Sequence, residues 1–206
     1  MDLVILVPGD QSIFPAPGNN MPAGGSLLGK PGGNDSSVPN WWANYAFLQG
    51  NTGIELMSMH QGMKQQVTTD VSNSARTSGR PVVTEFTCVK YVDPASVKLY
   101  DFCLRAQPLD TQKTPPTLLY ICRNSGEQLI AIMQFQLRYA LISEIQMQTH
   151  PNDMPTEQFK LNFAEILWRF RVQEADTTAG GNLTAGWSLA RNAPIGSFTL
   201  PGKPAP

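Results

Sequence analysis

The side chains of this chain that are able to do chemistry are few and scattered over its 206 residues. The two histidines are His60 and His150, and the second is followed by Asp153 in the stretch HPND. A structural metal site needs about four ligands, so this pair favours a solvated turn over a metal site. Neither HExxH nor GxSxG is present. The sequence therefore predicts no catalytic residue, no metal and no cofactor.

The cysteines and the charged side chains support the same reading. Cys88, Cys103 and Cys122 lie far apart in apolar segments without a CxxC motif, which predicts free, buried thiols in a reducing compartment. The acidic residues Glu144, Glu157 and Glu165 form no recognisable acid/base pair. Arg169 and Arg171 alternate on one strand face; phosphate binding is open to them, but a solvated or pore-facing surface is the simpler interpretation.

Composition limits the kinds of partner that the chain can have. Charged residues make up 15% of the sequence, against about 25% in an average soluble domain, and a surface poor in charge favours contact with other proteins. The net charge of −1 gives no basic footprint for nucleic acid. The start, MDLVILVPGD, lacks the basic region of a signal peptide, and the run LIAIM is too short to span a bilayer. We expect synthesis in the cytoplasm, no membrane insertion, and export only by a route that accepts folded protein.

One helix and about seven strands are predicted to position these residues. Asp93 and Pro94 suit the N-cap and first turn of a helix over about residues 94–106, and Leu99, Phe102 and Cys103 follow at helical spacing. The remaining apolar segments alternate with period two or are rich in β-branched residues, and Gly/Pro turns separate them. This pattern predicts a mainly β protein, a two-sheet β-barrel or sandwich with one flanking helix.

Two further segments set the domain limits. Residues 15–39 are rich in glycine and proline and include GKPGG, which lacks the strand, loop and helix frame of a phosphate-binding loop. They are predicted to be a loop inserted into a single domain over residues 1–192. Residues 193–206 are predicted to be a flexible C-terminal tail.

A long strand is predicted from Leu129 to Leu141, because apolar residues alternate throughout it. Its other face is polar in the middle, where it carries Gln134, Gln136 and Arg138. At about 3.3 Å per residue the strand would extend roughly 40 Å, which suits a coiled barrel or a sheet that extends beyond its own core.

The stretch LNFAEILWRF (161–170) fits both helical and strand periodicity. The β-rich context favours a strand whose apolar face changes near Ala164. A bulge would explain that change, and so would a strand with the core on one side and another subunit on the other. Under the second explanation Trp168 and Phe170 are subunit contacts.

Several motifs resemble, in order and spacing, the Hcp family, the tube protein of bacterial type VI secretion systems. The resemblance extends from about Ile54 to Asn192, together with the first strand. Its residues are Glu55, Ser58, Gly62 and Gln65; Lys90-Tyr91-Val92-Asp93; Arg123 with Gly126; Leu161-Asn162-Phe163-Ala164 with Trp168; and Gly186-Trp187 with Asn192. The chain departs from the family pattern at Met59 and Gln61, where tryptophans are usual, and at Ser188, where Asp is usual.

The resemblance implies a non-catalytic tube subunit that forms a homo-hexamer. It also implies stacked rings inside a contractile sheath, contacts with a VgrG-like spike and baseplate proteins, and secreted effectors in the lumen. The excursion Thr68–Pro81 matches an extended loop of the family, so we expect ring contacts from Ser72, Asn73, Ser74, Arg76, Ser78 and Gly79. Gln134, Gln136 and Arg138 are the expected lumen-facing residues. A monomeric ligand-binding β-barrel or a small hydrolase is the alternative, and it would need a closed cavity with converging polar groups.

Overall fold

The computed structural model describes residues 2–14, 27–28, 51–65, 67–69, 76–78, 80–124, 129–149, 151–173 and 179–204. Its single α-helix in these ranges is α1 (Ser96–Leu104), and a short 3-10 turn, η1, covers Gln11–Ile13. The strands are β1 (Asp2–Val7), β2 (Leu27–Leu28), β3 (Gly53–Leu56), β4 (Ser58–His60), β5 (Met63–Lys64), β6 (Val67–Thr69), β7 (Arg76–Ser78), β8 (Val82–Val83), β9 (Phe86–Tyr91), β10 (Thr117–Asn124), β11 (Leu129–Arg138), β12 (Leu141–Gln148), β13 (Thr156–Asn162), β14 (Glu165–Gln173), β15 (Ala179–Ser188) and β16 (Ala193–Pro194).

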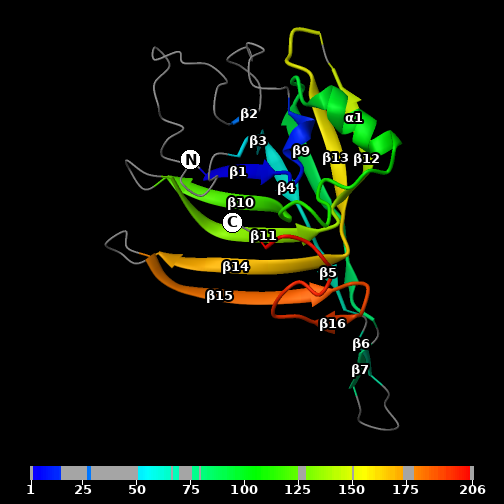
Figure 1. Cartoon of the computed structure of the whole chain (residues 1–206), viewed down its shortest axis with the longest axis vertical. Coiled ribbons are helices and arrows are strands. Elements are labelled where there is room, and N and C mark those ends of the chain that lie inside the picture. Colours follow the sequence, from blue (N-terminus) through cyan, green and yellow to red (C-terminus); the bar gives the residue numbers. More distant parts are fainter. Residues whose placement is uncertain are drawn as a thin grey trace.

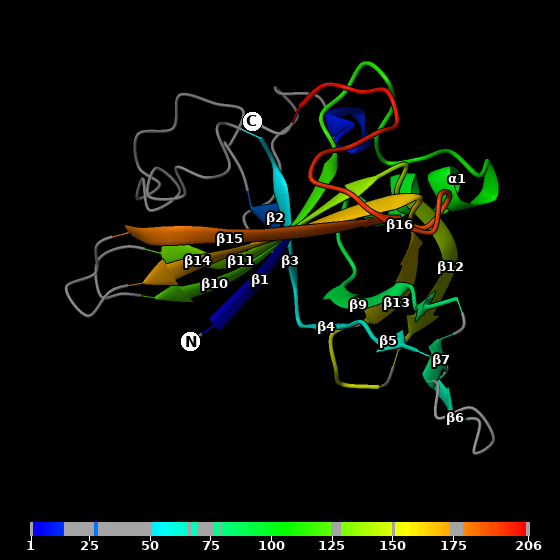
Figure 2. The same cartoon turned by 90° about the horizontal axis from the view of Figure 1, so that it is seen from below.

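Two antiparallel sheets form the body of the molecule (Figure 1). The larger has the strand order β16-β15-β14-β11-β10-β1-β3-β2, and the smaller has the order β12-β13-β9-β4. When the larger sheet is viewed edge-on, the smaller sheet lies at a steep angle to it, and α1 lies beside the smaller sheet (Figure 2). The predicted mainly β fold with one flanking helix is confirmed. The sheets, however, do not close into one hydrogen-bonded barrel among the residues that the structure describes.

The chain passes between the two sheets at three short corners. Met57 separates β3 from β4, Tyr139 and Ala140 separate β11 from β12, and Phe163 and Ala164 separate β13 from β14. Tyr139 has a positive φ of 53°, a backbone conformation that strands do not adopt. Strands that change sheet through a bend are the usual way in which two crossed sheets share one core.

These corners correct two of the sequence predictions. The segment over 129–141 is not one strand of 13 residues, because it bends at Tyr139. LNFAEILWRF is extended, as predicted, but it belongs to two strands of different sheets. Its apolar face changes because Phe163 and Ile166 both point into the same core from opposite sides of the corner. Neither a bulge nor a second subunit is needed to explain that change.

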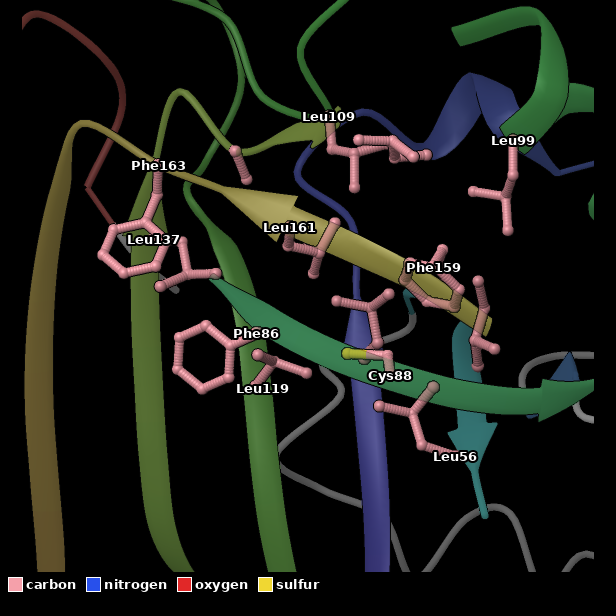
Figure 3. Packing of buried hydrophobic residues seen from close by; sticks show 14 of the residues in the cluster. Leu56, Phe86, Cys88, Leu99, Leu109, Leu119, Leu137, Phe159, Leu161 and Phe163 are labelled. Atoms are coloured by element: carbon pink, nitrogen blue, oxygen red, sulfur yellow. The ribbon is translucent and has the colours of Figure 1, made fainter. Parts of the chain in front are cut away.

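The core fills the space between the sheets. Phe86, Phe159 and Leu161 enter from the smaller sheet, and Leu119 and Leu137 from the larger (Figure 3). The Phe86 ring meets that of Phe135 edge-on, with centroids 5.2 Å apart. Every fully buried side chain of this size contributes about 1.5–3 kcal/mol. Side chains therefore occupy the interior that a ligand-binding barrel would keep open.

Helix α1 is fixed by a buried ionic network at its first turn. The Lys90 ammonium lies 2.7 Å from Asp93 Oδ2 and 2.7 Å from Glu157 Oε1, and all three side chains are inaccessible to solvent. Ser96 Oγ accepts from Lys90 and donates to Glu157. Asp93 does accept from the Ala95 N–H, at 2.8 Å, but the helix starts at Ser96, two residues later than predicted. Asp93 therefore ties the helix start to β9 instead of acting as its N-cap.

Candidate assembly surfaces and the C-terminal segment

The side chains first considered for chemistry lie apart from one another. His60 is exposed at the end of β4, and Asp153 accepts the N–H of Met154; His150 lies outside the described residues. Glu157 belongs to the Lys90 network, Glu144 pairs with Lys160, and Glu165 binds the C-terminal end of the chain. No group of three His, Cys, Asp or Glu side chains able to hold a metal occurs in the described ranges.

The cysteines are free, as predicted. Cys88 and Cys122 are buried, and Cys103 is half-buried on α1. Burial raises the pKa of the Cys88 thiol, and it raises the pKa of Cys122 to about 12. Since the thiolate is the nucleophile, both thiols are inert at neutral pH.

A ribbon of paired strands projects from the two sheets (Figures 1 and 2). We call it the arm: β5 pairs with β8, and β6 pairs with β7 further out. Met63, Val67 and Val82 on it are all more than half exposed. Arg76 and Ser78 of the predicted ring contacts lie in β7, whereas Ser72, Asn73, Ser74 and Gly79 lie outside the described residues. The arm therefore presents apolar side chains that the chain itself does not cover.

A second apolar surface lies where the larger sheet extends beyond its core. Met133, Phe170 and Leu183 sit side by side on β11, β14 and β15. They continue the core row of Phe135 and Trp168, two residues further along each strand. Exposure rises to 43% at Phe170 and 68% at Leu183. We call this row the overhang. Trp168, the other predicted subunit contact, packs at the edge of the core instead.

The opposite face of the same sheet is polar on β11 and partly covered, whereas on β1 and β10 it carries the buried apolar cluster of Ile5, Leu118 and Tyr120. Gln134 donates to the Tyr120 hydroxyl at 3.1 Å, and Gln136 donates to Gln134 at 3.2 Å. Gln134 is buried and Gln136 is half-buried, whereas Arg138 is only 1% exposed. Residues 193–204, which we call the C-terminal segment, cover Arg138. The C-terminal segment therefore shields Arg138 from solvent, and a lumen-facing position of Arg138 stays a prediction.

Two buried charges hold the C-terminal segment. Glu165 accepts the N–H of Thr199 at 2.9 Å, the N–H of Leu200 at 3.2 Å, and the Thr199 hydroxyl. Its neighbour on β11, Arg138, donates to the Lys203 carbonyl at 2.6 Å and lies 4.9 Å from the centre of the Phe198 ring. The flexible tail over residues 193–206 stays a prediction; in the structure, residues 193–204 lie against the sheet and are hydrogen-bonded to it.

Two glycines make room for this packing. A Cβ on Gly202 would lie 2.3 Å from the Arg138 guanidinium carbon. A Cβ on Gly186, the glycine of the Gly-Trp motif, would lie 2.7 Å from the Ile195 carbonyl oxygen. Ile195 donates its N–H to the Gly186 carbonyl at 3.0 Å, which fixes the start of the segment beside β15. The segment and the sheet thus fit closely at both ends.

Asp110 completes the polar corner beneath this segment. Its carboxylate accepts the N–H groups of Tyr139 and Ala140, at 2.8 and 2.7 Å, where β11 turns toward β12. Burial raises the pKa of Asp110, and these hydrogen bonds together with Arg138 oppose the rise. Burial acts on the pKa of Glu165 in the same direction. There, however, the donors of Thr199, Leu200 and Ser188 outweigh it and hold the pKa below its ordinary value.

Solved structures of a type six secretion system protein and of Hcp proteins have a similar fold. "Structure of a type six secretion system protein" is 25% identical, with a TM-score of 0.61, and the match covers 69% of this chain and 86% of that one. Hcp1 from Salmonella typhimurium is 15% identical, with a TM-score of 0.58, over 94% of this chain and 99% of that one. Hcp1 from the E. coli EAEC 042 pathovar is 14% identical, with a TM-score of 0.53, over 91% and 98%. No curated protein sequence matches. The fold is that of type VI secretion Hcp proteins.

The family follows from the sequence itself. The family described as "Type VI secretion system effector, Hcp" matches residues 49–170, which is more than half of the chain. The chain therefore belongs to the Hcp family, whose members are structural tube proteins secreted through the type VI apparatus, and its low identity to the solved structures makes it a divergent member. Among the residues that the structure describes, no helix has the length and apolar character needed to cross a bilayer.

Proposed function

We propose that this chain is the tube subunit of a type VI secretion system, that it closes into hexameric rings, and that the rings stack into an inner tube. Membership of the Hcp family is the observation that carries the proposal. The expected partners are a contractile sheath, baseplate proteins and a VgrG-like spike, with effectors carried in the lumen. Export would occur through the apparatus without a signal peptide, and the role would be structural, without catalysis or a cofactor.

The overhang and the arm support a role in assembly. A row of exposed apolar side chains beside a packed core is a surface that another protein typically covers. The overhang reaches β15, the strand next to the edge of the larger sheet. At this edge another copy of the chain has access to the overhang. The arm leaves the body in a different direction (Figure 2), so one surface is free for contacts within a ring and the other for contacts between rings.

The expected contacts follow from these surfaces. Phe170 of the overhang is the more plausible of the two predicted strand contacts, since Trp168 is already packed against the core. Residues 72–74, 76, 78 and 79 of the arm are proposed to contact a neighbouring subunit. Gln134 and Gln136 remain proposed lumen residues, and Arg138 joins them only if the C-terminal segment is displaced.

The oligomeric state of charge-introducing surface variants tests the proposal. Leu183→Asp places a charge in the overhang, and Val97→Asp places one on α1 at a site of similar exposure, 72% against 68%. Light scattering coupled to size exclusion should give a hexamer for the wild type and for Val97→Asp, and a folded monomer for Leu183→Asp. A monomeric wild type at high concentration would contradict ring formation, and a hexameric Leu183→Asp would exclude the overhang.

A further inference from the structure

A pocket of about 430 Å³ lies between the polar face of the larger sheet and the C-terminal segment. Its floor includes Gln136 and Leu167, and Phe198 and Leu200 belong to its cover. Its volume is within the range of small-ligand sites, about 300–1,000 Å³. Unlike the core, this space is not filled by side chains of the residues that the structure describes.

The charges around the pocket are unbalanced. Three cationic residues line it, Arg138, Arg169 and Lys203, and none of the described lining residues is acidic. The whole chain, by contrast, has a net charge of −1. Arg169 and Lys203 are exposed, so they lie within reach of an entering ligand, whereas Arg138 is buried at the inner end.

Arg138 is incompletely paired in its buried position. Its Nη1 donates to the Thr114 carbonyl at 3.2 Å and its Nη2 to the Lys203 carbonyl, but its Nε has no hydrogen-bond partner among the described residues. A buried charged group without its full set of partners is costly, so a negative charge in the pocket that Arg138 lines would be favourable.

Neither of the neighbouring carboxylates, Asp110 and Glu165, supplies a hydrogen-bond acceptor for Arg138 Nε. Asp110 Oδ2 is 3.5 Å from Arg138 Nη1, and the N–H groups of Tyr139 and Ala140 already occupy its oxygens. Glu165 is bound to Thr199 and Leu200. With the two acids included, the formal charge around the pocket is still positive, three cations against two anions.

We propose that this pocket binds an oxyanion, a carboxylate or phosphate group, which Arg169 and Lys203 bind directly and which the positive charge of the buried Arg138 stabilises. Arginine is well suited to this role, because its planar guanidinium presents several donors to one oxyanion. Two sources provide the group, a free small anion and an acidic side chain of a carried protein. The site is a property of the single chain, so binding of a free anion does not depend on the proposed tube, whereas the second source rests on the proposed function.

Titration calorimetry of the full chain at constant ionic strength tests the site. The probes are inorganic phosphate, succinate and acetyl-Glu-Glu-amide, with chloride as the reference anion. Saturable binding of phosphate or succinate would identify a free anion as the ligand, and binding of the dipeptide alone would identify a protein side chain. Absence of saturable binding by all three at 10 mM, on the order of the weakest affinity of interest, would overturn the proposal.

Two matched variants locate the binding. Arg169→Gln removes a cation that lines the pocket, and Arg171→Gln removes an exposed cation two residues further along the same strand, outside the lining. We expect Arg169→Gln to weaken binding about tenfold, the loss of one charge-assisted hydrogen bond, and Arg171→Gln to leave it unchanged. Equal weakening by both variants would show that the anion is attracted by general surface charge, and would overturn the assignment to this pocket.

Discussion

Replacing Glu165 with glutamine should release the C-terminal segment while leaving the rest of the fold in place. The carboxylate is fully buried and accepts two N–H groups and one hydroxyl from Thr199 and Leu200. The amide introduced by Glu165→Gln has the same shape, but it has one oxygen in place of two and presents its NH₂ group to other donors. The substitution therefore tests the hydrogen bonds and not the packing.

The size of the effect follows from those bonds. A hydrogen bond to a charged group contributes about 1.5–3 kcal/mol, and one or two of the three bonds are lost in Glu165→Gln. We take about 3 kcal/mol as the change in the free energy that docks the segment. Each 1.4 kcal/mol is a factor of ten, so the amides of Thr199 and Leu200 should exchange with solvent about 100-fold faster.

Hydrogen–deuterium exchange followed by mass spectrometry measures this directly on the peptide that contains residues 196–204. Peptides from β9 report on the core and should keep their protection. Glu144→Gln is the matched control, because Glu144 pairs with Lys160 on the smaller sheet, whereas Glu165 lies on the larger sheet that holds the segment. Unchanged protection of Thr199 and Leu200 in Glu165→Gln would refute the role given to these hydrogen bonds.

Three other outcomes are expected. Because the pKa of Glu165 is held below its ordinary value of 4.5, its contribution to docking is complete above that pH and is lost as the pH falls through the lower folded-state value. The protection factor of the C-terminal peptide, which corrects for the intrinsic pH dependence of amide exchange, should therefore fall on acidification in the wild type, and a protection factor that does not change with pH would contradict this. Lys90→Met should lower the free energy of unfolding, measured by urea titration, by about 3–5 kcal/mol, because the substitution leaves two buried carboxylates without their cation. Lys98→Met, on the exposed side of α1, is the control and should leave the free energy of unfolding nearly unchanged. A loss below about 1 kcal/mol for Lys90→Met would show that the network is not needed for stability. Deleting residues 72–79 should preserve the strand content measured by circular dichroism but abolish ring closure or stacking, and normal tubes from the deletion variant would rule out the arm as an assembly element.

The sequence was sufficient to predict the β class, the helix and the family, since each rests on local patterns. Leu99 and Phe102 recur at helical spacing, and both are buried. The apolar alternation on β11 is equally local, and Phe135 and Leu137 point into the core as it predicts. The motifs, taken in order along the chain, indicated the Hcp family, and the family match over residues 49–170 agrees.

The corners between the sheets were not predictable from the same patterns. Alternation with a period of two indicates which residues share a strand face. It does not indicate where a strand bends into another sheet. At Tyr139 the bend depends on Asp110, which lies 29 residues earlier and accepts the Tyr139 N–H. At Phe163 the change of apolar face was noticed, but its cause is a corner, and a corner becomes visible only when both sheets are in place.

The docked C-terminal segment was missed for a related reason. Its Gly/Pro composition suggests a mobile tail, and its partners, Glu165 and Arg138, lie 34 and 65 residues away from the groups that they bind. One signal was present. Glu165 stands alone between apolar neighbours in a strand, and an isolated charge in such a setting is usually paired when it is buried.

Electron microscopy of the purified, concentrated protein tests the central claim, that this Hcp-family chain is a tube subunit. The account predicts rings with an open centre and six subunits, alone or in short stacks, and it predicts that Leu183→Asp abolishes them. A homogeneous population of compact monomers at the highest concentration reached would contradict the account and would favour the alternative of a monomeric binding protein.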